Sequence, residues 1–207
     1  MVVPSLPSGY DDTRHVQAGR PDCHITVGFD RARRRIPRFL IQLHYQADTA
    51  PVRWEAIARM DHNETSTHGH DVYQEGLHVD LARRSGATVH LQVRHGPLPS
   101  NRGGLISAAV RYLRQEAQYA VDVYEGDRSP GRPPRFSPDG GGRPPTLKPS
   151  ATLRGGMSHE SPAEDALTPE ELDEVLADAT GSTPEQIRAG AEDLELAPLA
   201  EADVVDE

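Results

Sequence analysis

Five consecutive segments in which apolar residues occupy every second position dominate the first half of the chain. They lie at 24–29, 38–45, 52–60, 77–81 and 89–93. Such alternation over four to eight residues is typical of strands that place one face on a core. Because the connections between the segments are short, we predict an antiparallel meander of about five strands.

The periodicity changes after residue 100. From Leu105 to Val121 the apolar residues recur at intervals of three and four, which predicts one amphipathic helix over about 101–124. A serine or asparagine can cap its start, and Gly126 follows its end. The simplest fold for residues 21–127 is an α+β core, in which an antiparallel sheet carries this one C-terminal helix on one face.

The segments on either side of this core differ in composition. Residues 1–20 are rich in Pro, Ser, Gly and Asp, and we expect them to form a flexible N-terminal arm. Of the 29 residues in 128–156, 13 are Gly or Pro. A segment of this kind buries too little apolar surface to offset the entropy of ordering it, so we predict a disordered linker over 128–160.

The C-terminal segment is strongly acidic. Residues 155–207 hold 16 of the 32 acidic residues of the chain and one basic residue, Arg188. Two capping boxes, which begin at Thr168 and Thr183, predict an acidic helical hairpin tail over 161–207. We expect this tail to dock on a protein partner or to mask the arginines of its own chain. Its second helix has too few basic residues for DNA binding.

Several classes of protein are disfavoured. No stretch approaches the roughly 20 apolar residues that cross a bilayer, and the N-terminus lacks the basic head and apolar run of a secretory signal. Cys23 is the only cysteine, so an internal disulfide is excluded and we expect a small buried side chain. These features favour a cytoplasmic protein without a membrane partner, and they leave any cofactor unspecified.

Histidines gather on the predicted sheet. Eight of the ten lie between His24 and His95, and the densest run is at 61–78. Trp54 falls in the apolar phase of its segment, so we expect it in the core. If the apolar positions face the helix, the opposite face of the sheet carries Gln42, His44, Arg53, Glu55, Arg59, Asp61, His78, Asp80, His90, Gln92 and Arg94.

One interpretation of the histidine run is metal-independent chemistry on RNA. Cleavage of RNA requires a base for the 2′-hydroxyl proton and an acid for the leaving oxygen, and histidine suits both because its pKa lies near neutral pH. An arginine suits the phosphate because its fork matches the phosphate oxygens. Arg59, His62, His70 and His78 can supply this set.

Two other interpretations remain open. His68, His70, Asp71 and His78 offer imidazoles and a carboxylate that suit zinc or another transition metal, and a His-x-His pair in an extended segment points both rings to one side. Alternatively, the histidines are exposed on a loop and a solvated face, where some of them form structural hydrogen bonds.

Two basic features stand apart from the histidines. Residues 31–38 contain five arginines in eight positions, which can contact phosphates or serve solubility on a turn. Residues 100–104, Ser-Asn-Arg-Gly-Gly, open the predicted helix. Free N–H groups at a helix start can hold an anion, but this stretch fits no phosphate-loop pattern and is also explained as a simple cap.

The stretches 54–63 and 68–80 resemble an uncharacterised domain family of bacteria and archaea, and more distantly TumE-type toxins of toxin–antitoxin pairs. These toxins also combine a strand with Tyr and His, as in Leu43-His-Tyr45, a strand with Trp, and a loop dense in Asp, Asn and His. The resemblance covers residues 36–95, and the denser His-His run of the toxins is absent.

The resemblance implies a toxin-like protein that acts on RNA. The positions that match are Arg59, Asp61, His62, His70 and His78. The alternatives are a non-enzymatic protein-interaction module with an acidic tail, and a His/Asp metal-binding module.

Overall fold

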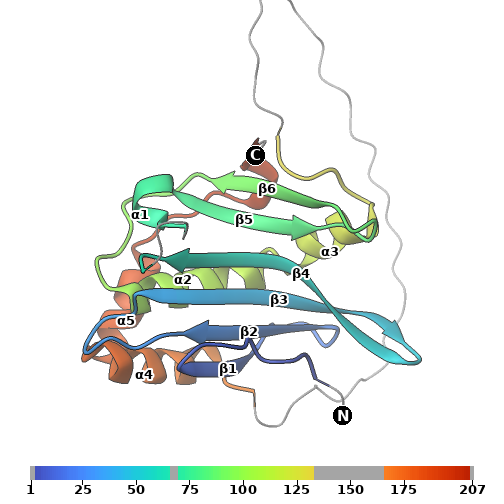
Figure 1. The fold of residues 1–207 in the computed structure, drawn as a ribbon. Coiled ribbons are helices and arrows are strands. Elements are labelled where there is room, and N and C mark those ends of the chain that lie inside the picture. Colours follow the sequence, from blue (N-terminus) through green and yellow to red (C-terminus); the bar gives the residue numbers. More distant parts are fainter. Residues whose placement is uncertain (1–2, 66–69, 133–165, 206–207) are drawn as a thin grey trace, which may run out of the picture.

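A computed structural model describes residues 3–65, 70–132 and 166–205 (Figure 1). It contains one antiparallel sheet in which the seven strands follow their order in the sequence. The strands are β1 (Asp12–Gln17), β2 (Cys23–Phe29), β3 (Arg38–Thr49), β4 (Val52–Asn63), β5 (Leu77–Ala82), β6 (Thr88–Val93) and β7 (Asp203–Val205). The helices are α1 (Val72–Glu75), α2 (Arg102–Gln115), α3 (Ala117–Glu125), α4 (Pro169–Thr180) and α5 (Pro184–Glu192), with a 3₁₀ turn at Leu199–Glu201.

The α+β class and the antiparallel meander are confirmed, but the prediction of about five strands is wrong. The two additional strands are β1, which pairs with β2, and β7, which pairs with β6. Neither segment has apolar residues at every second position. In β1 only Val16 is buried, and β7 has three residues. Their positions depend on the neighbouring strand and not on a pattern of their own.

A β-bulge in β4 corrects the predicted orientation of Trp54. Leu43 of β3 pairs with Ala58, whereas the next residue, His44, pairs with Ala56, so Ile57 is an extra residue in β4. Because of this extra residue, the side chains that precede Ile57 lie on the opposite faces from those that a regular alternation through residues 58–60 predicts. Ile57 is therefore buried in the core, and Trp54 lies half-buried on the outer face, 6.2 Å from the His24 ring.

The same bulge moves two residues off the predicted polar face. Glu55 lies opposite Tyr45, whose ring packs against Tyr124 of α3, so Glu55 is on the side that carries the helices. Arg53 is two residues before Glu55 in the same strand, and the two side chains form an ion pair at 3.3 Å. The predicted outer positions of Arg59, His78 and Asp80 lie beyond the bulge and agree with the pairing of Arg59 with Asp80.

Helices α2 and α3 lie across the apolar face of the sheet, where one helix was expected (Figure 1). The helical path is interrupted at Glu116, whose carboxylate accepts a hydrogen bond from the Leu199 N–H at 3.3 Å. Fully buried side chains of the sheet and of α2 form the core, among them Ile25, Ile41, Leu91, Leu105 and Ile106.

Both predicted capping boxes are present, and they start α4 and α5. The two helices pack against α2, with Leu176 and Ile187 fully buried. The backbones of α2 and α5 approach each other closely at two glycines: a Cβ on Gly104 would lie only 3.4 Å from the Cα of Gly190. Helices of the acidic tail are therefore part of the chain's own core, whereas most of the predicted linker lies outside the described residues.

Two further expectations concern Cys23 and membrane spans. Cys23 is buried as predicted, and burial raises the pKa of its thiol to about 12. Within the described ranges, no helix combines the length and the apolar character that a bilayer crossing requires.

Candidate functional site

Two residues of the histidine run form a hydrogen-bonded chain with a glutamate. Nδ1 of His70 lies 2.6 Å from Oε2 of Glu75, and Nε2 of His70 lies 3.0 Å from Nδ1 of His78. We call these three residues the histidine relay. Burial and the neighbouring His70 lower the pKa of His78, so its imidazole is neutral at pH 7.

The sheet face beside the relay is rich in carboxylates. Arg59 pairs with Asp61 at 3.2 Å, and Asp80, opposite Arg59, contacts His90 at 2.7 Å. The predicted residues Arg59, Asp61 and His78 thus share the outer face. With Asp61, Asp80 and Glu75 nearby, however, the local charge opposes a phosphate group.

His62 is separated from the relay by burial. It lies opposite Phe39 and is fully buried, with its Nδ1 accepting a hydrogen bond from the Val72 N–H at 3.4 Å. Its Nε2 has no hydrogen-bond partner among the described residues and lies 3.8 Å from Oε2 of Glu64. Burial and the charge of Arg102 lower the pKa of His62, which is therefore neutral and out of contact with solvent.

The residues proposed for a metal site are only partly brought together. His70 and His78 are adjacent, whereas the Asp71 carboxylate caps α1 by accepting from the Tyr73 N–H at 3.0 Å. His68 lies outside the described residues. Among the residues described, no group of three or more His, Cys, Asp or Glu side chains has an arrangement that could hold a metal ion. The metal site stays a prediction.

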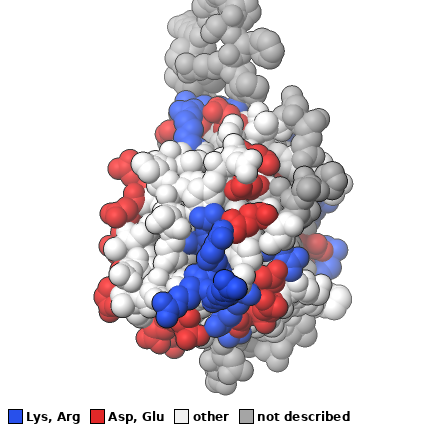
Figure 2. All heavy atoms as spheres, turned by 60° about the vertical axis from the view of Figure 1, so that its left-hand side comes forward, with Lys and Arg blue, Asp and Glu red and all other residues white. Residues whose placement is uncertain are grey.

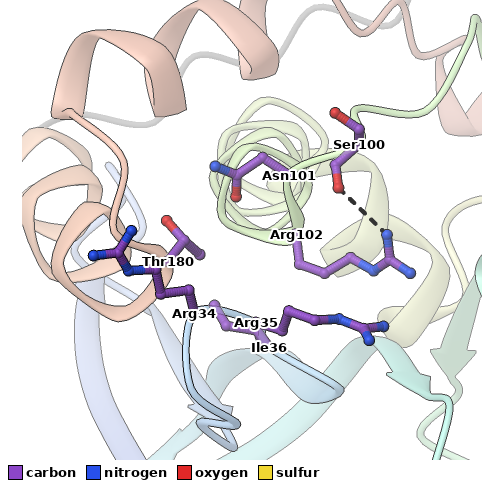
Figure 3. Close-up of a pocket in the computed structure, with 7 residues that line it drawn as sticks. All are labelled: Arg34, Arg35, Ile36, Ser100, Asn101, Arg102 and Thr180. Carbon is purple, nitrogen blue, oxygen red and sulfur yellow. Dashed lines mark hydrogen bonds between the residues drawn. The ribbon is translucent and has the colours of Figure 1, made fainter.

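A different part of the molecule contains a pocket lined by arginines (Figure 3). The turn between β2 and β3, the start of α2 and the end of α4 enclose a volume of about 220 Å³. We call this pocket the arginine cleft. Its lining residues are Arg34, Arg35, Ile36, Ser100, Asn101, Arg102 and Thr180.

The local structure explains how the arginines reach the cleft. Ala32 and Arg35 exchange two backbone hydrogen bonds, of 2.9 and 3.1 Å, and the tight turn between them places Arg34 at its tip. Arg102 is the first residue of α2, and its guanidinium stacks 3.8 Å from the centre of the Tyr73 ring. Arg35 and Arg102 extend in the same direction, while Arg34 reaches toward Thr180 (Figure 3).

One carboxylate partly neutralises the cleft. Arg35 donates to Oε1 of Glu64 at 2.7 Å, and Arg102 donates to Oε2 of the same side chain at 3.1 Å. Arg34 has no ion pair in the described part of the chain. Two guanidinium groups therefore share one carboxylate, and Arg34 adds a third positive charge to the cleft, next to the positive end of the 14-residue helix α2.

The surface agrees with this charge distribution. Figure 2 shows basic side chains gathered in a band on the side where the β2–β3 turn and the start of α2 lie. A second pocket, of about 320 Å³, also contains arginines, but it lies at the negative end of α3, and there Arg84 pairs with Glu125 at 2.8 Å. The helix end and the carboxylate compensate the arginines of that pocket.

In the sequence, the arginine run at 31–38 and the helix start at 100–104 are two separate features. No periodicity relates residue 34 to residues 102 and 180, because only the packing of α4 and of the turn against α2 brings them together. The histidine cluster at the other end of β2 was also missed. His15 contacts His24 at 2.8 Å, and burial lowers the pKa of His24 and of His44 to about 4, so these rings are neutral structural groups.

The model of a family described as "Domain of unknown function (DUF7718)" matches residues 11–129. The chain belongs to this family. The DUF7718 match begins at β1 and ends beyond α3, so it includes Glu64 and the three arginines of the cleft but stops before Thr180.

The DUF7718 match confirms the expected uncharacterised domain. Neither the curated proteins nor the solved structures include a match to this chain. The relation to TumE-type toxins stays a prediction.

Proposed function

We propose that the protein binds a phosphate ester in the arginine cleft. The observation that carries the proposal is that Arg35 and Arg102 share one carboxylate at the positive end of α2, while Arg34 lines the same cleft toward Thr180 (Figure 3). The guanidinium fork matches two oxygens of a phosphate, and a helix start favours an anion. The sequence features at 31–38 and 100–104 thereby act as one site.

The size of the cleft restricts what enters it. Its volume of about 220 Å³ is below the range of roughly 300 to 1,000 Å³ that is typical of pockets for whole small molecules. Among the described residues that line the cleft, Ile36 is the one apolar residue and none is aromatic. The phosphate group therefore occupies the cleft, and the remainder of the ligand lies outside it. RNA and a phosphorylated small molecule share this chemistry.

Calorimetric titration of the full chain tests the proposal. Inorganic phosphate, a phosphorylated monosaccharide and a short single-stranded RNA are the probes. We expect Arg34→Ala to weaken binding roughly tenfold, because a hydrogen bond to a charged group contributes about 1.5–3 kcal/mol. Arg83→Ala is the matched control, since Arg83 lines the second pocket and belongs to the same residue type.

The salt dependence of binding distinguishes the two sources of phosphate. For a single-stranded RNA that contacts several basic residues, a plot of log K against log salt concentration has a slope of about −0.7 for each phosphate contacted. For a small phosphate ester the same plot has a shallow slope. The proposal would be refuted if the unmodified chain binds none of the three probes at millimolar concentration.

A second candidate function is cleavage of RNA by the histidine relay. The observation in its favour is the pair of contacts, 2.6 and 3.0 Å, that joins Glu75, His70 and His78. The Glu75 carboxylate orients the His70 imidazole, so His70 and His78 can divide the acid and base roles of the cleavage between them. Arg59 is the cation on the same sheet face, where it pairs with Asp61 and where the surrounding carboxylates oppose a phosphate.

RNA integrity in cells that express the full chain tests this activity. Loss of cleavage in both His70→Ala and His78→Ala, with cleavage retained in His95→Ala, supports it. His95 is a suitable control because it is exposed and contacts the carbonyl of Gly96. Intact RNA with the unmodified chain removes this candidate and leaves phosphate binding unaffected.

A further inference from the structure

Glu64 occupies the position that a ligand anion would take between two arginines of the cleft. Its two carboxylate oxygens accept separately from Arg35, at 2.7 Å, and Arg102, at 3.1 Å. The side chain is 22% exposed, and the backbone N–H of Glu64 donates to the Pro37 carbonyl at 3.1 Å. The backbone is thus attached to the β2–β3 turn, and the side chain bridges from there to α2.

The nearby His62 has an unused hydrogen-bond donor. Because Nδ1 of His62 accepts from the Val72 N–H, the proton of the neutral ring is on Nε2. This buried Nε2–H has no acceptor among the described residues, which is unfavourable for a buried polar group. The nearest carboxylate oxygen is Oε2 of Glu64, at 3.8 Å.

We infer that Glu64 is a displaceable internal competitor for the phosphate ligand, and that His62 receives its carboxylate when the ligand binds. The inference rests on the proposed function. In the free protein, Glu64 holds Arg35 and Arg102 side by side. A phosphate takes over these guanidinium donors, since its anionic oxygens are the same kind of acceptor as a carboxylate.

The displaced carboxylate has a partner within short reach. A shift of about 1 Å brings Oε2 of Glu64 to hydrogen-bond distance from Nε2 of His62. After this exchange the arginines are paired with the ligand, and the buried imidazole N–H is paired with Glu64. The exchange removes the one unsatisfied donor of His62, which offsets part of the cost of breaking the Glu64 contacts.

Glu64→Gln separates competition from simple positioning, because the two predict opposite signs. If Glu64 competes, removal of its charge tightens the binding of inorganic phosphate by roughly tenfold in calorimetric titration of the full chain. If Glu64 only holds the arginines in place, the substitution leaves binding unchanged or weakens it. Glu125→Gln, which alters the Arg84 pair of the second pocket, is the matched control and leaves binding unchanged.

The ring nitrogens of His62 provide an independent readout. We expect the Nε2–H resonance of His62 to shift on addition of phosphate in the unmodified chain and to remain in place in Glu64→Gln. His62→Phe keeps an aromatic ring beside Phe39 and Tyr73 and removes the donor. It should weaken phosphate binding in the unmodified background and have no effect in the Glu64→Gln background.

The outcomes separate this inference from the function on which it rests. Phosphate binding by the unmodified chain with equal or weaker binding by Glu64→Gln overturns the role of Glu64 alone. Absence of binding in both proteins overturns the phosphate site itself. Binding by the unmodified chain that becomes about tenfold tighter in Glu64→Gln supports both.

Discussion

Asp173 is the buried carboxylate that connects the acidic tail to the core. Its side chain is fully buried, Oδ1 accepts from the Ser107 hydroxyl at 2.5 Å, and Oδ2 accepts from Arg111 at 2.8 Å. Arg188 lies farther away, at 3.8 Å. We predict that Asp173→Asn, which keeps the shape and the serine contact, lowers the free energy of unfolding mainly by loss of the Arg111 pair.

The magnitude follows from these contacts. A hydrogen bond to a charged group contributes about 1.5–3 kcal/mol, and the lower part of this range applies because the Arg111 side chain is 24% exposed. The pair with Arg188 adds at most about 1 kcal/mol because it is long and partly solvated. The expected loss is about 2 kcal/mol, which lowers the urea midpoint by about 1 M for an m value near 2 kcal/mol/M.

Urea denaturation of the full chain measures this loss. Asp178→Asn is the matched control, since Asp178 lies on the same helix, pairs with Arg31 at 2.9 Å and is 80% exposed. We expect the control to change stability by less than about 0.5 kcal/mol. Equal effects of the two substitutions would refute the reasoning that Asp173 anchors the tail.

Two further predictions concern groups outside the arginine cleft. Burial lowers the pKa of His24 and of His44 to about 4, so the unfolded chain binds more protons than the folded chain between pH 6.5 and 4. The contribution of these two neutral histidines to the free energy of unfolding is therefore fully present above pH 6.5, and it falls by a few kcal/mol as the pH is lowered toward 4. In denaturation curves, His44→Gln should flatten this pH dependence, whereas His95→Gln should not. The raised pKa of the Cys23 thiol predicts slow reaction with a disulfide reagent at pH 8 and fast reaction in denaturant; rapid reaction of the native protein would contradict the buried environment.

The sequence pattern predicted the strands and the main helix because the spacing of their apolar residues is regular, at every second position in the strands and at intervals of three and four in the helix. From Ile25 to Phe29 and from Leu77 to Leu81, each apolar position is in fact buried. The pattern failed at Trp54, because the bulge at Ile57 depends on the pairing with β3 and leaves the local composition unchanged. It also failed at Glu116, where the helical path is interrupted and the side chain accepts a hydrogen bond from Leu199, far along the chain.

For the candidate sites, local spacing was informative only for neighbours in sequence. His70 and His78 were predicted together and are in contact, because a four-residue helix and a glycine return the chain to β5. His62 was included with them, although its place on the side of β4 that faces Phe39 follows from the strand phase. The arginine cleft combines three segments distant in sequence, and no pairwise spacing can reveal that arrangement.

The acidic tail contributes to the cleft without neutralising it. Gly181 ends α4 with a φ of 65°, and a Cβ at this position would lie 2.9 Å from Cδ of Arg34. The stem of Arg34 therefore packs against a residue that has no side chain, beside Thr180. The nearby carboxylate of the same helix, Asp178, pairs with Arg31 instead. The docked tail thus forms one wall of the cleft while leaving Arg34 without a carboxylate partner in the described part of the chain, so its guanidinium remains available to an external anion.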